Sequence, residues 1–235
     1  MAPRVLGLPR GEWTMRALVS LGFALICASA AGSATISCGE GGPVAVAPDP
    51  AMAHQICGAA QQASDLLGRC DIQAPASLTI TAVGETVPGC IGVYHCGEHR
   101  IEVLTPEAIE EVRRPDALFA HIPADRYFDS VVVHEIVHAL YDDSPCPFAT
   151  CVASSEYLAY ALQIDSLRLE DRGPITAQAP LDKTISRDAI SPMILFMAPD
   201  KFALLSWAHL HQRENRCAWL RGVLDGSILF DRERP

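Results

Sequence analysis

The sequence predicts an α+β fold, because short β-strand patterns come first along the chain and helical patterns follow them. The strand patterns fall mostly between residues 78 and 104, where β-forming side chains alternate with polar ones. From Asp129 onward the pattern becomes helical. No linker-like stretch separates two cores, so we expect one domain over residues 35–235. A chain of 235 residues that is 49% apolar can bury a sizeable core.

The first half of the predicted domain has clear start and stop signals. Asp49 can cap a helix, Pro50 suits the first helical position, and Gly68 ends the helix. Three strands follow; a hairpin loop joins the last two, and a short helix capped by Thr105 comes next. The expected elements are a helix over about 50–67, strands over 78–83, 91–95 and 100–104, and a short helix from 105.

The second half is expected to be helical. The run from Val131 to Leu140 contains neither glycine nor proline, and Ser154 and Ser155 can cap a helix that ends near Leu167. The remaining expected elements are a loop over 173–180 and helices over about 199–212 and 216–224.

Residues 1–34 have the pattern of a secretory signal peptide. Three arginines precede a small and apolar run over 17–31, and small residues precede a cleavage point after Ala30 or Ala34. The run is too short to favour a membrane-spanning helix of about 20 residues. Met15 begins an even cleaner signal, so it competes with the first methionine as the true start. We therefore expect a secreted or periplasmic protein with no membrane span after cleavage.

The nine cysteines indicate a disulfide framework. Cys27 lies in the leader, and the remaining eight form an even number in an exported chain. Local pairs are expected between Cys90 and Cys96 and between Cys146 and Cys151. A cysteine metal site is not favoured, because no two cysteines have the Cys-x-x-Cys spacing.

The charge balance disfavours nucleic acid and anionic lipid as partners. The formal net charge is −10, and no block of basic residues is present. Phosphate contacts need clustered lysines and arginines, and anionic membrane surfaces attract the same clusters.

The ten residues from Val131 to Leu140 are the most informative segment of the chain. As a helix this segment is apolar on nearly every side and should be buried, yet it carries His134, Glu135 and His138. Burying these groups without partners is costly. The two histidines are four residues apart, so both imidazoles lie on one helix face and can bind one cation. This is the His-Glu-x-x-His pattern of zinc peptidases, and it predicts one zinc ion.

A catalytic zinc ion takes three protein ligands and leaves one position open. Glu156 is the favoured third ligand, because it lies 18 residues after His138, in the first turn of the next expected helix, where a carboxylate is stabilised. The intervening segment is long enough to set the two helices side by side, and a disulfide within it would hold the turn. Asp142 and Asp143 stay open as alternative ligands.

His134, Glu135 and His138 followed by Glu156 resemble the gluzincins, zinc metallopeptidases whose third ligand is a glutamate. The resemblance covers about 25 residues directly, and the run over 156–160 is similar to one in a small group of secreted bacterial gluzincin-like proteins. It implies a zincin-like fold: a small mixed sheet, a buried metal-binding helix, a glutamate-bearing helix and a helical C-terminal part. By this resemblance, His134, His138 and Glu156 bind zinc, and Glu135 is the general base.

The resemblance also implies a reaction and leaves two points open. Glu135 would accept a proton from zinc-activated water during peptide-bond hydrolysis, and Tyr157, Tyr160 or His209 would stabilise the oxyanion. A peptide or protein substrate would lie along the strand at 91–95 or the one at 100–104. The chain lacks the Asn-Glu-x-x-x-Asp stretch of thermolysin-like enzymes, so the hydrogen-bond partners of the two histidines are unassigned. It also lacks the Gly-x-Met-x-Asn motif, so nothing supports an aminopeptidase.

The leading hypothesis is a secreted zinc-dependent peptidase, with an endopeptidase favoured. Two other functions stay open: a protein in which the zinc ion is structural, and a disulfide-stabilised exported binding protein in which the motif is accidental. Glu135 argues against a purely structural zinc ion, because such a site has no need of a base. The residues predict neither the substrate preference nor the oligomeric state.

Overall fold

The three inner strands of the sheet alternate between buried and half-buried side chains, as expected for a sheet that helices cover on one face. Ala45, Ile80 and Ile101 lie in one row across three neighbouring strands, and all three are fully buried. The five strands have the spatial order β1-β2-β3-β5-β4. They are β1 (Ala34–Ser37), β2 (Val44–Ala47), β3 (Thr79–Val83), β4 (Gly92–His95) and β5 (Arg100–Leu104).

The sheet is mixed. The β1–β2 and β4–β5 pairs are antiparallel, whereas the β2–β3 and β3–β5 pairs are parallel. β4 lies at an edge, where it pairs only with β5 within this sheet, and β5 lies inside the sheet. Of the two strands expected to carry a substrate, β4 is therefore the one with a free edge.

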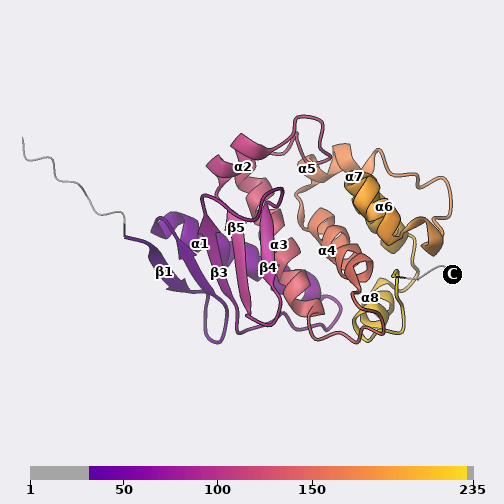
Figure 1. The fold of residues 1–235 in the computed structure, drawn as a ribbon, viewed down its shortest axis with the longest axis horizontal. Coiled ribbons are helices and arrows are strands. Elements are labelled where there is room, and N and C mark those ends of the chain that lie inside the picture. The colour runs from indigo at the N-terminus through magenta and orange to yellow at the C-terminus, as the bar shows by residue number, and fades with distance from the viewer. Residues whose placement is uncertain (1–31, 232–235) are drawn as a thin grey trace, which may run out of the picture. The chain divides into compact units, whose positions relative to one another are not determined.

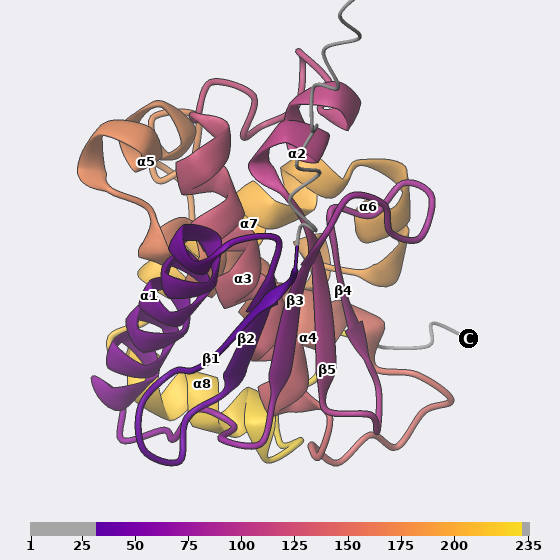
Figure 2. The same ribbon diagram turned by 90° about the vertical axis from the view of Figure 1, so that its left-hand side faces the viewer.

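Helices cover one face of the sheet and then pack on one another (Figure 1). α1 and α3 lie against the strands, α4 packs on α3, and α7 packs on α4. Figure 2 shows α3 behind the strands and α1 beside them, and the mixed sheet with its separate helices confirms the α+β class. The helices over the described residues are α1 (Pro50–Gly68), α2 (Pro106–Val112), α3 (Ala124–Tyr141), α4 (Val152–Ser166), α5 (Leu169–Thr176), α6 (Pro192–Met197), α7 (Pro199–His211) and α8 (Arg216–Leu224), with a 3₁₀ turn at Arg187–Ala189.

The computed structural model describes residues 32–231, which belong to one compact unit. The leader predicted over residues 1–34 lies outside the described residues except for its last three, and Ala34 begins β1. Within the described range, no helix is both long and apolar enough to cross a membrane.

Local sequence patterns correctly predicted the positions of most helices and strands. The Asp49 side chain accepts a hydrogen bond from the backbone N–H of Met52 at 2.9 Å, and Thr105 caps α2 in the same way at 3.3 Å. The predicted strand at β3, the β4–β5 hairpin, α7 and α8 are confirmed within one or two residues. The strands β1 and β2 and the helix α6 were not predicted.

α4 begins at Val152, two residues before the predicted caps, because a residue remote in the sequence caps it. The buried Asp231 carboxylate accepts hydrogen bonds from the backbone N–H groups of Ala153 and Ser154 at 2.6 and 2.9 Å. It also accepts one from the Ser154 hydroxyl at 2.5 Å. The C-terminal segment therefore stabilises the start of α4, and the predicted capping serines lie inside the helix.

We expect Asp231→Ala to lower the free energy of unfolding by about 2 to 4 kcal/mol, because two buried backbone N–H groups and a buried hydroxyl lose their acceptor. Urea or thermal unfolding measures the change. Asp182→Ala, at an exposed loop position, is the matched control and should change stability by less than about 0.5 kcal/mol. Equal effects of the two substitutions would contradict this account of the cap.

α5 continues through part of the loop predicted over 173–180. It contains Gly173 and Pro174 and ends at Thr176. Asp171 and Ile175 are buried, and Ile175 is fully so. Packing of these side chains outweighs the weak helix propensity of glycine and proline, which was the basis of the loop prediction.

Three disulfides are present among the described residues, and one of the two predicted local pairs is wrong. Cys90 and Cys96 are free, because the extended strand β4 lies between them. Its four residues alone span about 13 Å, whereas bonded cysteines need Cα atoms within about 7 Å. Disulfides are typical of oxidising compartments, which is consistent with an exported protein. The bonded pairs are Cys38–Cys57, Cys70–Cys217 and the predicted Cys146–Cys151.

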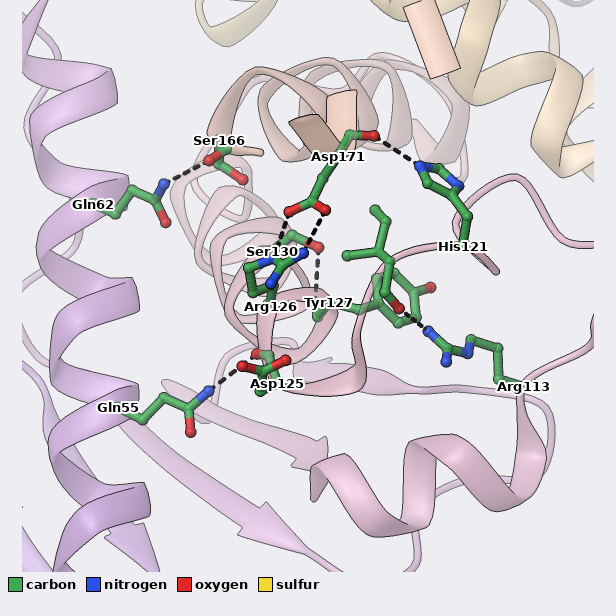
Figure 3. Close-up of polar contacts among 11 residues, drawn as sticks. Gln55, Gln62, Arg113, His121, Asp125, Arg126, Tyr127, Ser130, Ser166 and Asp171 are labelled. Atoms are coloured by element: carbon green, nitrogen blue, oxygen red, sulfur yellow. Dashed lines mark hydrogen bonds and ion pairs between the residues drawn. The ribbon is translucent and has the colours of Figure 1, made fainter. Parts of the chain in front are cut away.

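The N-terminal end of α3 has no side-chain cap, and polar contacts from other elements stabilise it instead (Figure 3). The Arg126 guanidinium donates to both carboxylate oxygens of Asp171 in α5, at 2.7 and 2.8 Å. His121 donates to the backbone carbonyl of the same aspartate at 2.8 Å. Gln55 of α1 donates to the backbone carbonyl of Asp125 at 3.0 Å. These contacts tie the start of α3 to α1 and α5.

Candidate metal centre

α3 is buried along its middle, as its apolar sequence predicts. Every residue from Val131 to Val137 is buried, since α3 lies between the sheet and α4. His134 and His138 project from this helix one turn apart, and Glu156 projects from the neighbouring α4. Because α4 starts earlier than predicted, Glu156 is its fifth residue rather than part of its first turn.

The structure brings the three predicted ligands together. The Nε2 atoms of His134 and His138 are 2.9 Å apart. Glu156 Oε2 lies 3.4 Å from His134 Nε2, and Glu156 Oε1 lies 3.6 Å from His138 Nε2. In the part of the chain that the structure describes, these three residues form the group whose donor atoms could hold a metal ion.

The geometry of this group fits one small cation. Ligands about 2.0–2.1 Å from a tetrahedral zinc ion lie about 3.3 Å from one another, within the observed range. Glu156 Oε2 is buried and has no hydrogen-bond partner among the described residues. Two imidazole nitrogens facing each other at 2.9 Å repel if both carry lone pairs, and a shared cation removes that repulsion.

A chain of hydrogen bonds determines which nitrogen of His134 is free. The Ser130 hydroxyl donates to the Tyr127 carbonyl at 2.8 Å, so it accepts from the Gln163 amide nitrogen at 3.2 Å. The Gln163 amide oxygen must then accept from His134 Nδ1–H, at 3.0 Å. A neutral His134 therefore has its lone pair on Nε2, which faces His138 and Glu156.

His138 has a comparable partner. Its Nδ1 lies 2.7 Å from the hydroxyl oxygen of Ser155 in α4, which leaves Nε2 for the cluster. Burial and the charge of His134 together lower the pKa of His138 to about 4, although the charge of Glu156 opposes them. His138 is consequently neutral at pH 7, the form that binds metals.

These partners were missed at the sequence level. Gln163 lies seven residues after Glu156, which places both on one face of α4, and Ser130 lies four residues before His134 on α3. The helical spacing could have found them, but glutamine and serine carry no metal-ligand signature of their own.

We expect Gln163→Leu to weaken zinc binding by about 10- to 100-fold, because His134 loses the acceptor that orients its ring. Competition with a chromophoric chelator measures the zinc dissociation constant. Gln163→Glu keeps an acceptor for Nδ1–H and is the matched control, which should bind zinc at least as tightly as the original chain. Zinc affinity that is the same with leucine as with glutamate would show that the ring needs no such support.

Glu135 is buried beside the cluster and is not part of it. Burial, with a smaller contribution from the charge of Glu156, raises the pKa of Glu135 to about 7, although the charge of His134 opposes the rise. In Glu156, burial raises the carboxyl pKa, but the nearby imidazoles of His134 and His138 outweigh this, so the pKa is below its ordinary value. The pKa values of the two carboxyl groups are therefore shifted in opposite directions within one site.

The strand β4 packs directly on Glu135 at a glycine. A Cβ atom on Gly92 would lie 2.5 Å from Glu135 Oε1, 2.7 Å from Glu135 Cγ and 2.8 Å from Val131 Cγ1. Only glycine therefore lets the edge strand approach this carboxylate so closely.

We expect Gly92→Ala to lower the free energy of unfolding by about 1 to 3 kcal/mol, because the methyl group overpacks the contact between β4 and α3. Denaturant unfolding measures the loss. Gly84→Ala, in the loop that precedes β4, is the matched control, since a Cβ there meets no atom within 4 Å. A similar loss at both glycines would rule out the close approach as its cause.

A cavity of about 760 Å³ opens over the cluster. β4 forms one wall, and the segment between α3 and α4, closed by the Cys146–Cys151 disulfide, forms another. We call this cavity the metal cleft. Its lining includes the three clustered residues and Glu135.

Asp142, an alternative ligand at the sequence level, has another role. Its Oδ2 accepts hydrogen bonds from the Tyr94 hydroxyl and from the backbone N–H of Gly97, both at 2.9 Å. It therefore ties the end of the β4–β5 hairpin to the end of α3, and neither it nor Asp143 belongs to the metal cluster.

Comparison with known proteins gives a family. The sequence model of one protein family matches residues 44–233, which is most of the chain and includes the whole cluster. The chain belongs to DUF6639, described as a family of unknown function. No curated protein and no solved structure matches this DUF6639 chain.

Of the three residues expected to stabilise an oxyanion in the DUF6639 chain, one lines the metal cleft. The Tyr157 hydroxyl and His209 Nδ1 are 2.9 Å apart in a buried pair, and neither residue lines the cleft. Tyr160 does line it, and its ring packs nearly at right angles to that of His134 with the centroids 4.7 Å apart. Tyr160 is therefore the remaining candidate for the residue that stabilises the oxyanion.

Proposed function

We propose that the protein is a secreted zinc-dependent peptidase with a zincin-like fold. One observation carries the proposal: His134, His138 and Glu156 converge on one point, while the buried Glu135 lies beside them against an edge strand. A peptidase needs both parts, because the ligands hold the metal and a nearby carboxylate moves protons.

Each residue has a distinct role in the proposed reaction. When bound, a zinc ion acts as a Lewis acid that acidifies water and polarises a carbonyl group. Glu135 accepts a proton from the attacking water and then delivers it to the leaving amine. The Tyr160 hydroxyl donates a hydrogen bond to the developing oxyanion. Gln163 and Ser155 orient the two imidazoles throughout.

The free edge of β4 is the proposed binding site for the substrate backbone. β4 lines the metal cleft, and its unpaired side can bond an extended peptide as an added strand. Gly92 brings this edge against Glu135, so a peptide bound there passes the proposed base.

A purely structural zinc ion is the second candidate. A structural site closes with a fourth protein ligand. Among the described residues the cluster offers three, which supports an open position and therefore catalysis. Export to the periplasm or cell exterior is part of the proposal, and the three disulfides support it.

The test combines metal analysis with peptide hydrolysis by the purified exported protein. We expect one zinc ion per chain, cleavage of casein or a peptide library, loss of cleavage with 1,10-phenanthroline, and recovery with added zinc. Stoichiometric zinc without any cleavage would favour the structural role. Absence of zinc binding would exclude both the peptidase and the structural zinc site.

A further inference from the structure

A second cavity, of about 540 Å³, adjoins the metal cleft, and we call it the side cavity. The loop over residues 84–91 between β3 and β4 forms one wall, and the last turn of α2 with the segment after it forms another. Leu104 of β5, Tyr127 of α3 and Asp200 of α7 also line it. Nothing in the proposed reaction uses this cavity.

The two cavities meet next to the proposed reaction centre. Gly89, Cys90, Ile91 and Tyr127 line both. An extended chain advances about 3.3 Å per residue, so Cys90 lies within about 7 Å, along the chain, of Gly92. Because Gly92 is where β4 meets Glu135, a peptide that passes this carboxylate can place a neighbouring side chain in the side cavity.

The lining of the side cavity is largely apolar. Val87 and Val112 are 51% and 57% exposed at its rim, and they are among the few large hydrophobic residues that the described part of the chain exposes. Deeper in, the rings of Phe119 and Tyr127 stack with centroids 5.4 Å apart. Exposed apolar side chains that gather around a concave site are typical of a binding pocket.

The charges at the rim favour an uncharged occupant. Its arginines already have partners: Arg113 pairs with Glu110 at 2.6 Å, and Arg114 pairs with Asp116 at 3.1 Å. The lining also carries three carboxylates, which would repel an acidic side chain. They exceed its arginines by one, and Asp200 lies 3.9 Å from Arg114, so the lining holds no strong excess of negative charge that would select a basic side chain. The charged lining residues are Glu85, Glu111, Asp200, Arg113 and Arg114.

We propose that the side cavity binds an uncharged apolar side chain, aromatic or long aliphatic, of a peptide that lies in the metal cleft. The inference rests on the proposed function, because the peptide is the proposed substrate. It adds a substrate class: peptides with a large apolar residue next to the cleaved bond.

Two free cysteines make this site directly measurable. Cys90 lines both cavities, whereas Cys96, at the other end of β4, lines the metal cleft alone, and both thiols are exposed. Alkylation of each thiol by iodoacetamide is followed by mass spectrometry in Glu135→Gln protein loaded with zinc, so that the probe peptide stays intact. Cys96 reports occupancy of the metal cleft itself, and the alkylation rate of each thiol is compared with its rate in peptide-free protein.

The probes are the blocked pentapeptides Ala-Ala-Phe-Ala-Ala and Ala-Ala-Ser-Ala-Ala. At ten times its dissociation constant, we expect the phenylalanine peptide to slow Cys90 alkylation about tenfold relative to peptide-free protein, and the serine peptide at the same concentration to have little effect. Val87→Asp and Val112→Asn should each abolish the difference between the peptides. Leu169→Asp, 75% exposed on α5, is the matched control and should preserve it.

The outcomes separate this inference from the proposed function. Equal protection of Cys90 by both peptides, or protection that survives both valine substitutions, overturns the side-cavity assignment. If the wild-type protein also cleaves both peptides at equal rates, the peptidase proposal stands and only the role of the side cavity is refuted. If the phenylalanine peptide selectively protects Cys90 but the wild-type protein cleaves no peptide, the side cavity is supported as a peptide-binding site and catalysis is refuted.

Discussion

Glu135→Gln is expected to abolish peptide hydrolysis while leaving one zinc ion bound per chain. Glutamine has nearly the same shape, so it keeps the contact with Gly92, but its amide cannot take a proton from water or return it to the leaving amine. Loss of such a proton-transfer group lowers kcat by about 10² to 10⁴-fold. Steady-state cleavage of a fluorogenic peptide and metal analysis of the same sample measure both effects.

Glu107→Gln is the matched control for this experiment. Glu107 is exposed in the first turn of α2 and lies outside the metal cleft. Its substitution should leave both cleavage and zinc content unchanged. An unaltered kcat in Glu135→Gln would refute the role of this carboxylate as the base, whereas loss of zinc would show that it supports the metal.

His138→Ala is expected to weaken zinc binding by more than the roughly 100-fold upper range for a supporting residue such as Gln163, because it removes a ligand itself. Ligand binding to the folded state raises the melting temperature, so zinc should stabilise the original chain and have little effect on the variant. A thermal unfolding series across free zinc concentrations measures this difference and also shows whether the variant folds.

His54→Ala is the matched control, since His54 is exposed on α1 and outside the cluster. It should keep the zinc-dependent rise in melting temperature. The same rise in His138→Ala would mean that zinc binds elsewhere, and the assignment of the ligands to α3 and α4 would fail. Glu156→Ala is expected to behave as His138→Ala does.

Several elements of the fold were predictable because their signals are local. Asp49 and Thr105 cap the helices that follow them through contacts three residues away, and the β4–β5 hairpin follows from alternation across a short loop. The buried character of α3 was also predictable, since a helix that is apolar on every side has no stable position at the surface.

The wrong predictions share one cause, which is that distant contacts outweighed local preference. α4 starts at Val152 because Asp231 caps it from nearly 80 residues away. α5 continues past Gly173 because Ile175 is buried. Cys90 and Cys96 are close in sequence, but pairing with β5 keeps the chain between them extended.

The sequence by itself determined that two imidazoles share one helix face with a glutamate beside them, because a spacing of four residues has one meaning on a helix. Tertiary packing decided that Glu156 joins them rather than Asp142 or Asp143, that Gln163 and Ser155 orient their rings, and that Gly92 lets β4 pack against Glu135. The reason is physical: helical periodicity acts over a few residues, whereas contacts between elements depend on how whole helices and strands bury their apolar faces together.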